Sequence, residues 1–252
     1  MANFDQAYSA YYDLLYADKD YSSEADYVHK LVQKFGIDGS RTLLDIGCGT
    51  GKHAAALAEK GYCVCGIDRS VEMIEKAKIL SANKESLSFQ VASADDFSFL
   101  NRFDVVTSLF HVISYLTGNE VLFKCFKRVF DALNENGVFI FDFWYGPAVF
   151  AQKPENRIKI LENDSCKIHR FAHPEEDSCR NIVTVKYNMI CIDKNTNFSA
   201  SFSEDHPMRY FFLPELQFML GQCGFSEIVF EEFLTGADPS PDTWGVCCIA
   251  KK

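Results

Sequence analysis

The segment LLDIGCGTG at residues 43–51 constrains the fold more than any other part of the chain. A short apolar run is followed by the acidic Asp45 and by Ile46. Three glycines then stand at every second position, Gly47, Gly49 and Gly51. Glycine admits positive φ and leaves no Cβ in the way of a ligand. The pattern predicts a strand that enters a tight turn and opens a helix, at the point where doubly wound sheets bind nucleotides.

The spacing of these glycines separates the classes of nucleotide fold. A dinucleotide fold uses G-x-G-x-x-G, and the position of its last glycine is Lys52 here. The chain has no G-x-x-x-x-G-K-[ST], which excludes a P-loop. The D-x-G-x-G-x-G pattern resembles the first motif of class I S-adenosylmethionine (SAM)-dependent methyltransferases. The resemblance implies SAM as cofactor.

Composition limits the remaining possibilities. With 252 residues, 48% of them apolar, the chain is long enough for one α/β domain and a small lobe. Its net charge of −10 disfavours nucleic acid as a partner. The ten cysteines include no C-x-x-C, which favours reduced, buried thiols over disulfides or a metal site, including Cys63 and Cys65 in one apolar run. No signal peptide or membrane-length apolar run is present, so we expect a cytoplasmic protein with no membrane partner.

Strand and helix patterns alternate through the first half of the chain. Residues 1–35 predict helices with a break near 18–21, the second one opened by a capping box of Ser23 and Asp26 and closed by Gly36. Apolar strands are predicted at 42–46, 62–67, 87–91, 103–109 and 138–143, and helices between them at 52–60, 71–80 and 120–133. This alternation predicts a parallel sheet with helices on both faces.

The pattern changes after residue 147. Strands without helices at 157–162, 166–172, 181–192 and 198–212 predict an inserted antiparallel meander, followed by a helix from 213 and strands at 225–233 and 244–251. Class I methyltransferases have a seven-stranded sheet whose last strand is antiparallel, and this order matches it. We therefore predict an α/β protein: a Rossmann-like seven-stranded sheet flanked by helices, with an inserted antiparallel β lobe. The predicted domains are a SAM-binding domain at 1–150 and 213–252, capped by the N-terminal helices, and a substrate lobe at 151–212.

The resemblance also implies which residues hold the cofactor. Asp68 ends a strand 21 residues after Gly47, where a carboxylate accepts from both ribose hydroxyls. Backbone N–H groups of the turn at 47–51 meet the methionine carboxylate, and Asp45 accepts from the ammonium, directly or through water. Asp95 or Asp96 accepts from the adenine amine, and Asp95 is preferred. The predicted cofactor residues are Tyr21, Asp45, Gly47, Cys48, Gly49, Gly51, Asp68, Arg69, Met73, Asp95, Asp96 and Leu109.

The acceptor is indicated by other segments. The [DN]-P-P-[YFW] motif of base and glutamine methylation does not follow the strand at 103–109. The tyrosine-rich segment 11–16 and FDFWYGP at 141–147 resemble bacterial N-methyltransferases of dTDP-linked amino sugars. The resemblance implies a nucleotide-linked amino sugar as acceptor, with the N-terminal helix over the SAM site. Candidate substrate contacts are Tyr16, Trp144, Tyr145 and Arg209, and a pyrophosphate has the candidates Arg209, His206 and Lys153.

Methyl transfer is an in-line displacement, for which positioning supplies much of the rate. An attacking amine must be neutral, so a nearby His or Tyr can take or relay its proton. The candidates for this proton are His111 and Tyr115, and Tyr12 is a hydroxyl candidate for holding the amine. Because the amino-sugar enzymes have a histidine where this chain has Tyr115, His111 or water remains an alternative base. O- or C-methylation of another small metabolite, and SAM binding without catalysis, also stay open. We expect no metal, a small-molecule substrate, and a monomer or homodimer.

Overall fold

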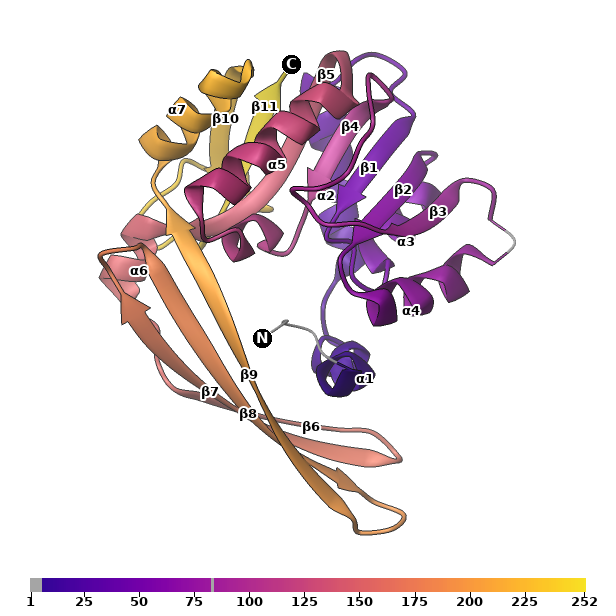
Figure 1. The fold of residues 1–252 in the computed structure, drawn as a ribbon, viewed down its shortest axis with the longest axis vertical. Helices are drawn as coiled ribbons and strands as arrows, with labels where there is room; N and C mark the ends of the chain where they lie inside the picture. Colours follow the sequence, from indigo (N-terminus) through magenta and orange to yellow (C-terminus); the bar gives the residue numbers. More distant parts are fainter. Residues whose placement is uncertain (1–5, 83) are drawn as a thin grey trace.

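The central sheet has the predicted class I arrangement (Figure 1). The structure is a computed structural model that describes residues 6–82 and 84–252, with side chains from residue 11 onward. Five parallel strands stand in the order β3-β2-β1-β4-β5, and β11 and β10 extend the sheet beyond β5, with β11 antiparallel to both of its neighbours. Their bounds are β1 Thr42–Ile46, β2 Cys63–Asp68, β3 Leu87–Val91, β4 Phe103–Ser108, β5 Leu133–Tyr145, β10 Ser226–Glu232 and β11 Gly245–Lys251.

Helices cover both faces of this sheet because alternate side chains of the buried strands point to opposite sides. Leu43 packs with one group of helices and its neighbour Leu44 with the other. The first group is α2 (Tyr21–Phe35), α3 (Lys52–Glu59) and α4 (Val71–Ser81), and the second is α5 (Asn119–Ala132) and α7 (Leu213–Cys223). The predicted fold class is confirmed.

The insert is the predicted antiparallel meander. Strands β6 (Arg157–Glu162), β7 (Cys166–Asp177), β8 (Ile182–Asp193) and β9 (Ser199–Phe211) pair in sequence order and form a long curved ribbon beside the core (Figure 1). β9 also pairs in parallel with the end of β5, which attaches the meander to the central sheet. A short helix that the sequence did not predict, α6 (Gly146–Gln152), lies between β5 and β6.

The N-terminal helix α1 (Gln6–Leu15) lies between the meander and the core domain (Figure 1). Leu15 is fully buried and packs with Ile168 and Met189 of the meander. Residues 1–5 of the predicted helical region lie outside the described residues.

The start of helix α2 differs from the prediction made from the sequence. It begins at Tyr21, and its N-cap is Asp20, whose Oδ1 accepts from the Ser23 N–H at 2.9 Å. The predicted capping box of Ser23 and Asp26 is therefore wrong, because the Ser23 N–H already donates to the carboxylate of Asp20. Gly36 ends the helix as predicted.

The cysteines are mostly buried, with three exceptions. Seven of the ten are buried, whereas Cys63 and Cys179 are exposed and Cys166 is half-buried. The prediction that the apolar run buries Cys63 is wrong: Cys63 is the first residue of β2 and is exposed, whereas Cys65, on the same face of the strand, is buried. Within the described ranges, no helix combines the length and apolarity needed to cross a membrane.

Candidate functional site

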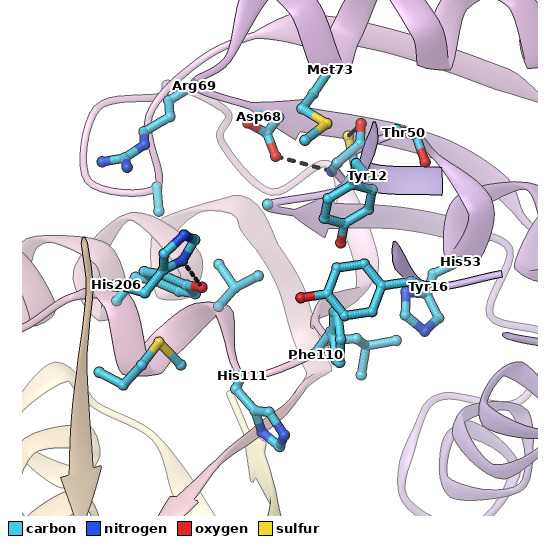
Figure 2. A pocket seen from close by; sticks show the side chains of 18 of the residues that line it. Tyr12, Tyr16, Thr50, His53, Asp68, Arg69, Met73, Phe110, His111 and His206 are labelled. Atoms are coloured by element: carbon cyan, nitrogen blue, oxygen red, sulfur yellow. Dashed lines mark hydrogen bonds between the residues drawn. The ribbon is translucent and has the colours of Figure 1, made fainter. Parts of the chain in front are cut away.

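A cavity of about 310 Å³ opens at the carboxyl ends of β1, β2 and β4, between the core domain, α1 and one face of the meander (Figure 2). Its floor contains the glycine turn, and Tyr12 and Tyr16 of the N-terminal region lie side by side within it, with ring centroids 4.8 Å apart. A Cβ built on Gly49 would lie 3.9 Å from the Tyr12 hydroxyl. The Tyr12 hydroxyl therefore sits over the glycine turn.

The backbone of the glycine turn is tied to strand β2. The N–H groups of Gly47 and Cys48 donate to the Ile67 carbonyl at 2.8 and 3.0 Å. The Gly49 N–H donates to Oδ2 of Asp68 at 2.9 Å. These donors are satisfied within the protein, so the predicted contact between them and a ligand carboxylate is not supported. Their role is to hold the turn in shape.

Two glycines of the turn have different neighbours. Gly47 lines the cavity with φ of +70°, and a Cβ there would lie only 2.5 Å from Cγ1 of Val112. Gly51, at φ of +82°, is the N-cap of α3 and does not line the cavity. A Cβ on Gly51 would lie 2.6 Å from Phe89, so this glycine allows α3 to pack closely on the sheet.

Asp68 stands at the end of β2, on the wall of the cavity. Its Oδ1 accepts from the Ser70 N–H at 2.9 Å, and its Oδ2 from Gly49. Burial raises the pKa of Asp68, and the two backbone hydrogen bonds oppose this rise. The N-cap of α4 is Ser70, whose side chain accepts from Met73. Asp68 is therefore free of the capping role and presents a carboxylate to the cavity.

Two buried polar atoms near the turn have no hydrogen-bond partner in the part of the chain that the structure describes, Oδ2 of Asp45 and the hydroxyl of Tyr21. Burial raises the pKa of Asp45 to about 6, although nearby His53 and a hydrogen bond from Thr107 at 2.9 Å lower it. Tyr21 lines the cavity beside Lys52, whose Nζ lies 5.3 Å from the tyrosine ring. Lys52 is itself paired with Asp13 at 2.8 Å, so the unpartnered groups are the donor of Tyr21 and the acceptor of Asp45, a combination that fits the carboxylate and the ammonium of an amino-acid ligand.

The cavity continues past β3. Ala92, Ser93 and Ala94 line it, as do Met73 and Leu109. The two predicted adenine ligands do not line it. Of these, Asp95 is half-buried and accepts from the Ser93 hydroxyl, one residue from the cavity wall, whereas Asp96 is exposed.

The turn after β4 is strained. Phe110 and His111 both have positive φ, 67° and 60°, which is rare for residues with side chains and common at functional sites. Asp142 of β5 holds this turn: its Oδ1 accepts from the His111 N–H at 3.0 Å, and its Oδ2 lies 2.8 Å from Nδ1, out of line for a well-directed hydrogen bond. Burial alone would raise the pKa of Asp142, but the charge and hydrogen bonds of His111 lower it.

A buried hydrogen-bonded chain enters the cavity from the meander. The Tyr115 hydroxyl lies 2.8 Å from Nδ1 of His206 (dashed in Figure 2), and Nε2 of His206 lies 2.9 Å from a Glu204 carboxylate oxygen. Burial holds the pKa of Tyr115 well above its ordinary value. A carboxylate only accepts, so ionised Glu204 requires a proton on Nε2. Nδ1 then accepts, and the tyrosine hydroxyl donates to it.

The structure brings most of the predicted residues together at this cavity. Those that line it are Tyr12, Tyr16, Tyr21, Gly47, Cys48, Gly49, Asp68, Arg69, Met73, Leu109, His111, Tyr115 and Trp144. Asp45 lies beside the turn, at the end of β1.

Three predicted substrate contacts lie elsewhere. Tyr145 packs on the core, and Lys153 follows α6. Arg209 donates to Asn119 at 2.7 Å and pairs with Glu215, so it braces β9 against α7 and does not line the cavity. Both terminal nitrogens of its guanidinium bond to these internal partners, whereas the buried Nε has no hydrogen-bond partner among the described residues.

Sequence reasoning missed several cavity residues on the meander. Arg170, Val185, Tyr187 and Met208 all line the cavity, and His206 was assigned only to a pyrophosphate. The signal was the alternation of the strands: Tyr187 pairs with Glu204 and Val185 with His206, so these four residues share one face. Among the described residues, no cluster of His, Cys, Asp or Glu is arranged to hold a metal ion.

Comparison with known protein families identifies the class of protein. A family described as "Methyltransferase domain" matches residues 43–137, the segment from the glycine turn to the start of β5. The chain therefore carries a SAM-dependent methyltransferase domain, and SAM is its cofactor. The two unpartnered atoms of Asp45 and Tyr21 agree with the amino-acid end of that molecule.

Individual relatives are more distant. A Geobacillus protein (strain WCH70) named as a methyltransferase is 29% identical over 138 residues, 54% of this chain and 56% of its own length. The dTDP-3-amino-3,6-dideoxy-alpha-D-glucopyranose N,N-dimethyltransferase of Streptomyces fradiae is 30% identical over 151 residues, 59% of this chain and 58% of its own length. The match thus spans little more than half of these relatives. The crystal structure of Streptomyces venezuelae DesVI superposes with a TM-score of 0.79 at 21% identity and covers 99% of each chain, so the whole fold is shared.

Proposed function

We propose that this protein transfers the methyl group of SAM to the amine of a small acceptor, such as a nucleotide-linked amino sugar. The observation that carries the proposal is the cavity itself, where the glycine turn faces the proton-accepting chain of Tyr115, His206 and Glu204. The amino-sugar enzyme of Streptomyces fradiae supports the choice of acceptor. In this proposal residues 151–212 form the acceptor lobe, and 1–150 with 213–252 form the SAM-binding domain.

The proposed cofactor contacts follow the length of the cavity. Asp68 accepts from the ribose hydroxyls, and Met73 and Leu109 supply apolar contacts. Asp45 accepts from the ammonium and Tyr21 donates to the carboxylate, while Lys52, which is paired with Asp13 at 2.8 Å, adds positive charge beside Tyr21. Asp95 remains the proposed partner of the adenine amine, since the segment beside it lines the cavity.

Affinity for SAM is expected to fall as pH falls, because Asp45 has a pKa of about 6 in the free protein. An ammonium binds the ionised carboxylate, so below pH 6 binding must first remove a proton, and the favourable contact is lost as pH drops. Between pH 7 and pH 5 the dissociation constant should rise about tenfold, the factor that corresponds to one unit of pH. Calorimetry at both values checks this.

The Asp45→Asn variant is the control for this pH dependence. It removes the titrating group and keeps the shape, so its affinity should be lower at pH 7 and should change little toward pH 5. His53 and Asp68 also influence this carboxyl and stay in place in the variant. An unchanged pH dependence in Asp45→Asn would show that another group is responsible.

The acceptor amine is proposed to lie between the glycine turn and Tyr115. SAM, when bound, supplies a methyl group on a sulfonium that leaves as a neutral thioether, taking the electron pair of the broken C–S bond. The amine lone pair forms the new N–C bond, and the amine then carries the positive charge. The Tyr115 oxygen accepts the released proton as its own proton passes to Nδ1 of His206, and Glu204 stabilises the resulting imidazolium.

An amine suits these residues better than an alcohol. A methylated amine carries a positive charge and can release its proton to an imidazole, whereas an aliphatic hydroxyl is too weak an acid for a neutral imidazole to ionise. The aromatic wall fits the same chemistry, since the faces of Tyr12, Tyr16 and Phe110 attract a positive charge as it moves from sulfur to nitrogen.

The Tyr12→Phe variant is expected to lose about tenfold in kcat/KM, the equivalent of one hydrogen bond, with little change in SAM affinity. The reason is that the Tyr12 hydroxyl sits over the glycine turn, where it orients the amine. Steady-state kinetics and calorimetry measure the two quantities. Tyr11→Phe is the matched control, because Tyr11 stacks on Phe202 of the meander and does not line the cavity. A loss confined to SAM affinity would place Tyr12 at the cofactor.

The proposal is tested with isotopically labelled SAM and a panel of dTDP-amino sugars, simple amines, phenols and sugar alcohols. Transfer of label to amines supports it. Label on oxygen or carbon would replace it with an O- or C-methyltransferase, and SAM binding without transfer to any member would indicate a binding protein.

A further inference from the structure

Arg170 of β7 lines the cavity with an unsatisfied charge. Its Nη1 atom is buried and has no hydrogen-bond partner among the described residues. No ion pair of Arg170 occurs in that part of the chain either. A guanidinium with a buried, unpaired N–H is unfavourable until an acceptor reaches it.

Aromatic faces hold this guanidinium in place. Its Cζ lies 5.1 Å from the ring centroid of Tyr187 and 6.0 Å from that of Tyr16. Arg209, on β9 of the same meander with β8 between the two strands, differs in having the carboxylate of Glu215 as an ion-pair partner. Arg170 is thus oriented by stacking, and its N–H groups stay available for planar, two-point binding of an oxyanion.

The guanidinium lies close to the proposed proton acceptor. The Tyr187 ring contacts both groups: its centroid is 5.1 Å from Cζ of Arg170 and 5.0 Å from the centroid of the His206 ring. One aromatic ring therefore separates the two side chains, on the same face of the meander. A compact molecule that reaches both needs an amine at one end and an oxyanion at the other.

We propose that Arg170 binds an oxyanion carried by the acceptor itself, so that the preferred substrate is an amine bearing a carboxylate or a phosphate group. The inference rests on the proposed function, since it names a second group on the same acceptor. The oxyanion has two sources, the pyrophosphate of a nucleotide sugar and the carboxylate of an amino acid. Arg170 selects the charged acceptor and places its amine at Tyr115.

Two pairs of acceptors test this, and one member of each pair lacks the anionic group. The pairs are dTDP-3-amino-3,6-dideoxyglucose with the free amino sugar, and glycine with glycinamide. The charged member of one pair is expected to be methylated with a kcat/KM about 100-fold higher, the size of a charge-assisted hydrogen bond. The pair that responds identifies the source.

Variants then assign the preference to this residue. Arg170→Gln should abolish the preference by raising KM for the charged acceptor until the charged and neutral members of the pair are methylated equally well, with unchanged SAM affinity. Arg170→Lys should keep part of it. Arg180→Gln is the matched control, because Arg180 lies exposed near the β7–β8 turn, paired with Asp177 at 2.7 Å. Circular dichroism confirms that the variants fold.

If none of the four acceptors is methylated, a binding measurement tests whether Arg170 binds an oxyanion. Inorganic pyrophosphate and acetate are titrated into the protein saturated with S-adenosylhomocysteine. Binding that disappears in Arg170→Gln supports the inference, and no binding, or binding that survives the change, overturns it. If neutral amines are methylated and replacing Arg170 has no effect, the inference about Arg170 is wrong while the proposed function stands. If the protein binds SAM and methylates no amine in any panel, the proposed function itself is wrong.

Discussion

Replacing His206 with alanine is expected to lower kcat for methyl transfer about 100-fold, the lower end of what a positioned acid or base contributes. The dissociation constant of SAM should stay unchanged, since His206 contacts Tyr115 and Glu204 on the meander side of the cavity. Without the imidazole, the Tyr115 hydroxyl loses the acceptor that Nδ1 of His206 provides for its proton. The methylated amine must then lose its proton to water in a closed, largely aromatic site. Single-turnover rates and calorimetry on the same preparations measure both effects.

The pH profile distinguishes proton transfer from a merely structural loss. The His206→Ala defect should shrink as pH rises, because bulk base replaces the relay and more of the acceptor amine is neutral. Glu204→Gln should lower kcat less, since it keeps a hydrogen bond to Nε2 and removes only the charge that stabilises the imidazolium. Tyr115→Phe should resemble His206→Ala.

His169→Ala is the matched control for His206→Ala. His169 lies on β7 of the same meander and does not line the cavity, so its removal should leave kcat intact. Equal losses of kcat in His169→Ala and His206→Ala, or a defect in His206→Ala that does not depend on pH, would contradict the assignment.

The hydrogen-bonded chain of Tyr115, His206 and Glu204 also shows what the sequence alone could not predict. The residues just past β4 were expected to carry the base, and Tyr115 does line the cavity there. Its histidine partner lies 91 positions away on β9. Strand pairing in the meander brings His206 to this point, and the two-residue junction between β9 and β5 fixes it there. Neither the register nor the curvature of a long ribbon follows from local residue patterns.

Local patterns did predict the central sheet and the wall around Asp68, because both depend on short-range features. Apolar strands, glycines at positive φ and an acidic strand end are readable within a few residues. The sequence pattern was misleading where a predicted ligand-binding group already has a partner within the protein. The N–H of Gly49 is bonded to Asp68, and Arg209 is paired with Glu215. Such pairs are set by tertiary packing, and each one removed a predicted ligand contact.

The Asp68→Ala variant is expected to weaken SAM binding about 10- to 100-fold, the cost of losing a charged hydrogen-bond acceptor. Two effects act in the same direction. The ribose hydroxyls lose their proposed acceptor, and the N–H groups of Gly49 and Ser70 lose theirs, so the glycine turn is less firmly held. Isothermal calorimetry with SAM and with S-adenosylhomocysteine should show similar losses, because both compounds carry the same ribose.

Asp104→Ala is the matched control. Asp104 also accepts from backbone N–H groups, those of Arg41 and Thr42 at 2.9 and 3.0 Å, but it lies at the opposite end of the sheet and does not line the cavity. Both variants should lower the melting temperature of the cofactor-free protein, since Asp68→Ala leaves two backbone donors without their acceptor, and Asp104→Ala leaves two backbone donors and the side chains of Thr42 and Asn134 without theirs. Only Asp68→Ala should lose cofactor affinity. If the two variants bound SAM equally well, Asp68 would be a structural brace of the turn, and the ribose would have to be held by another residue of the wall.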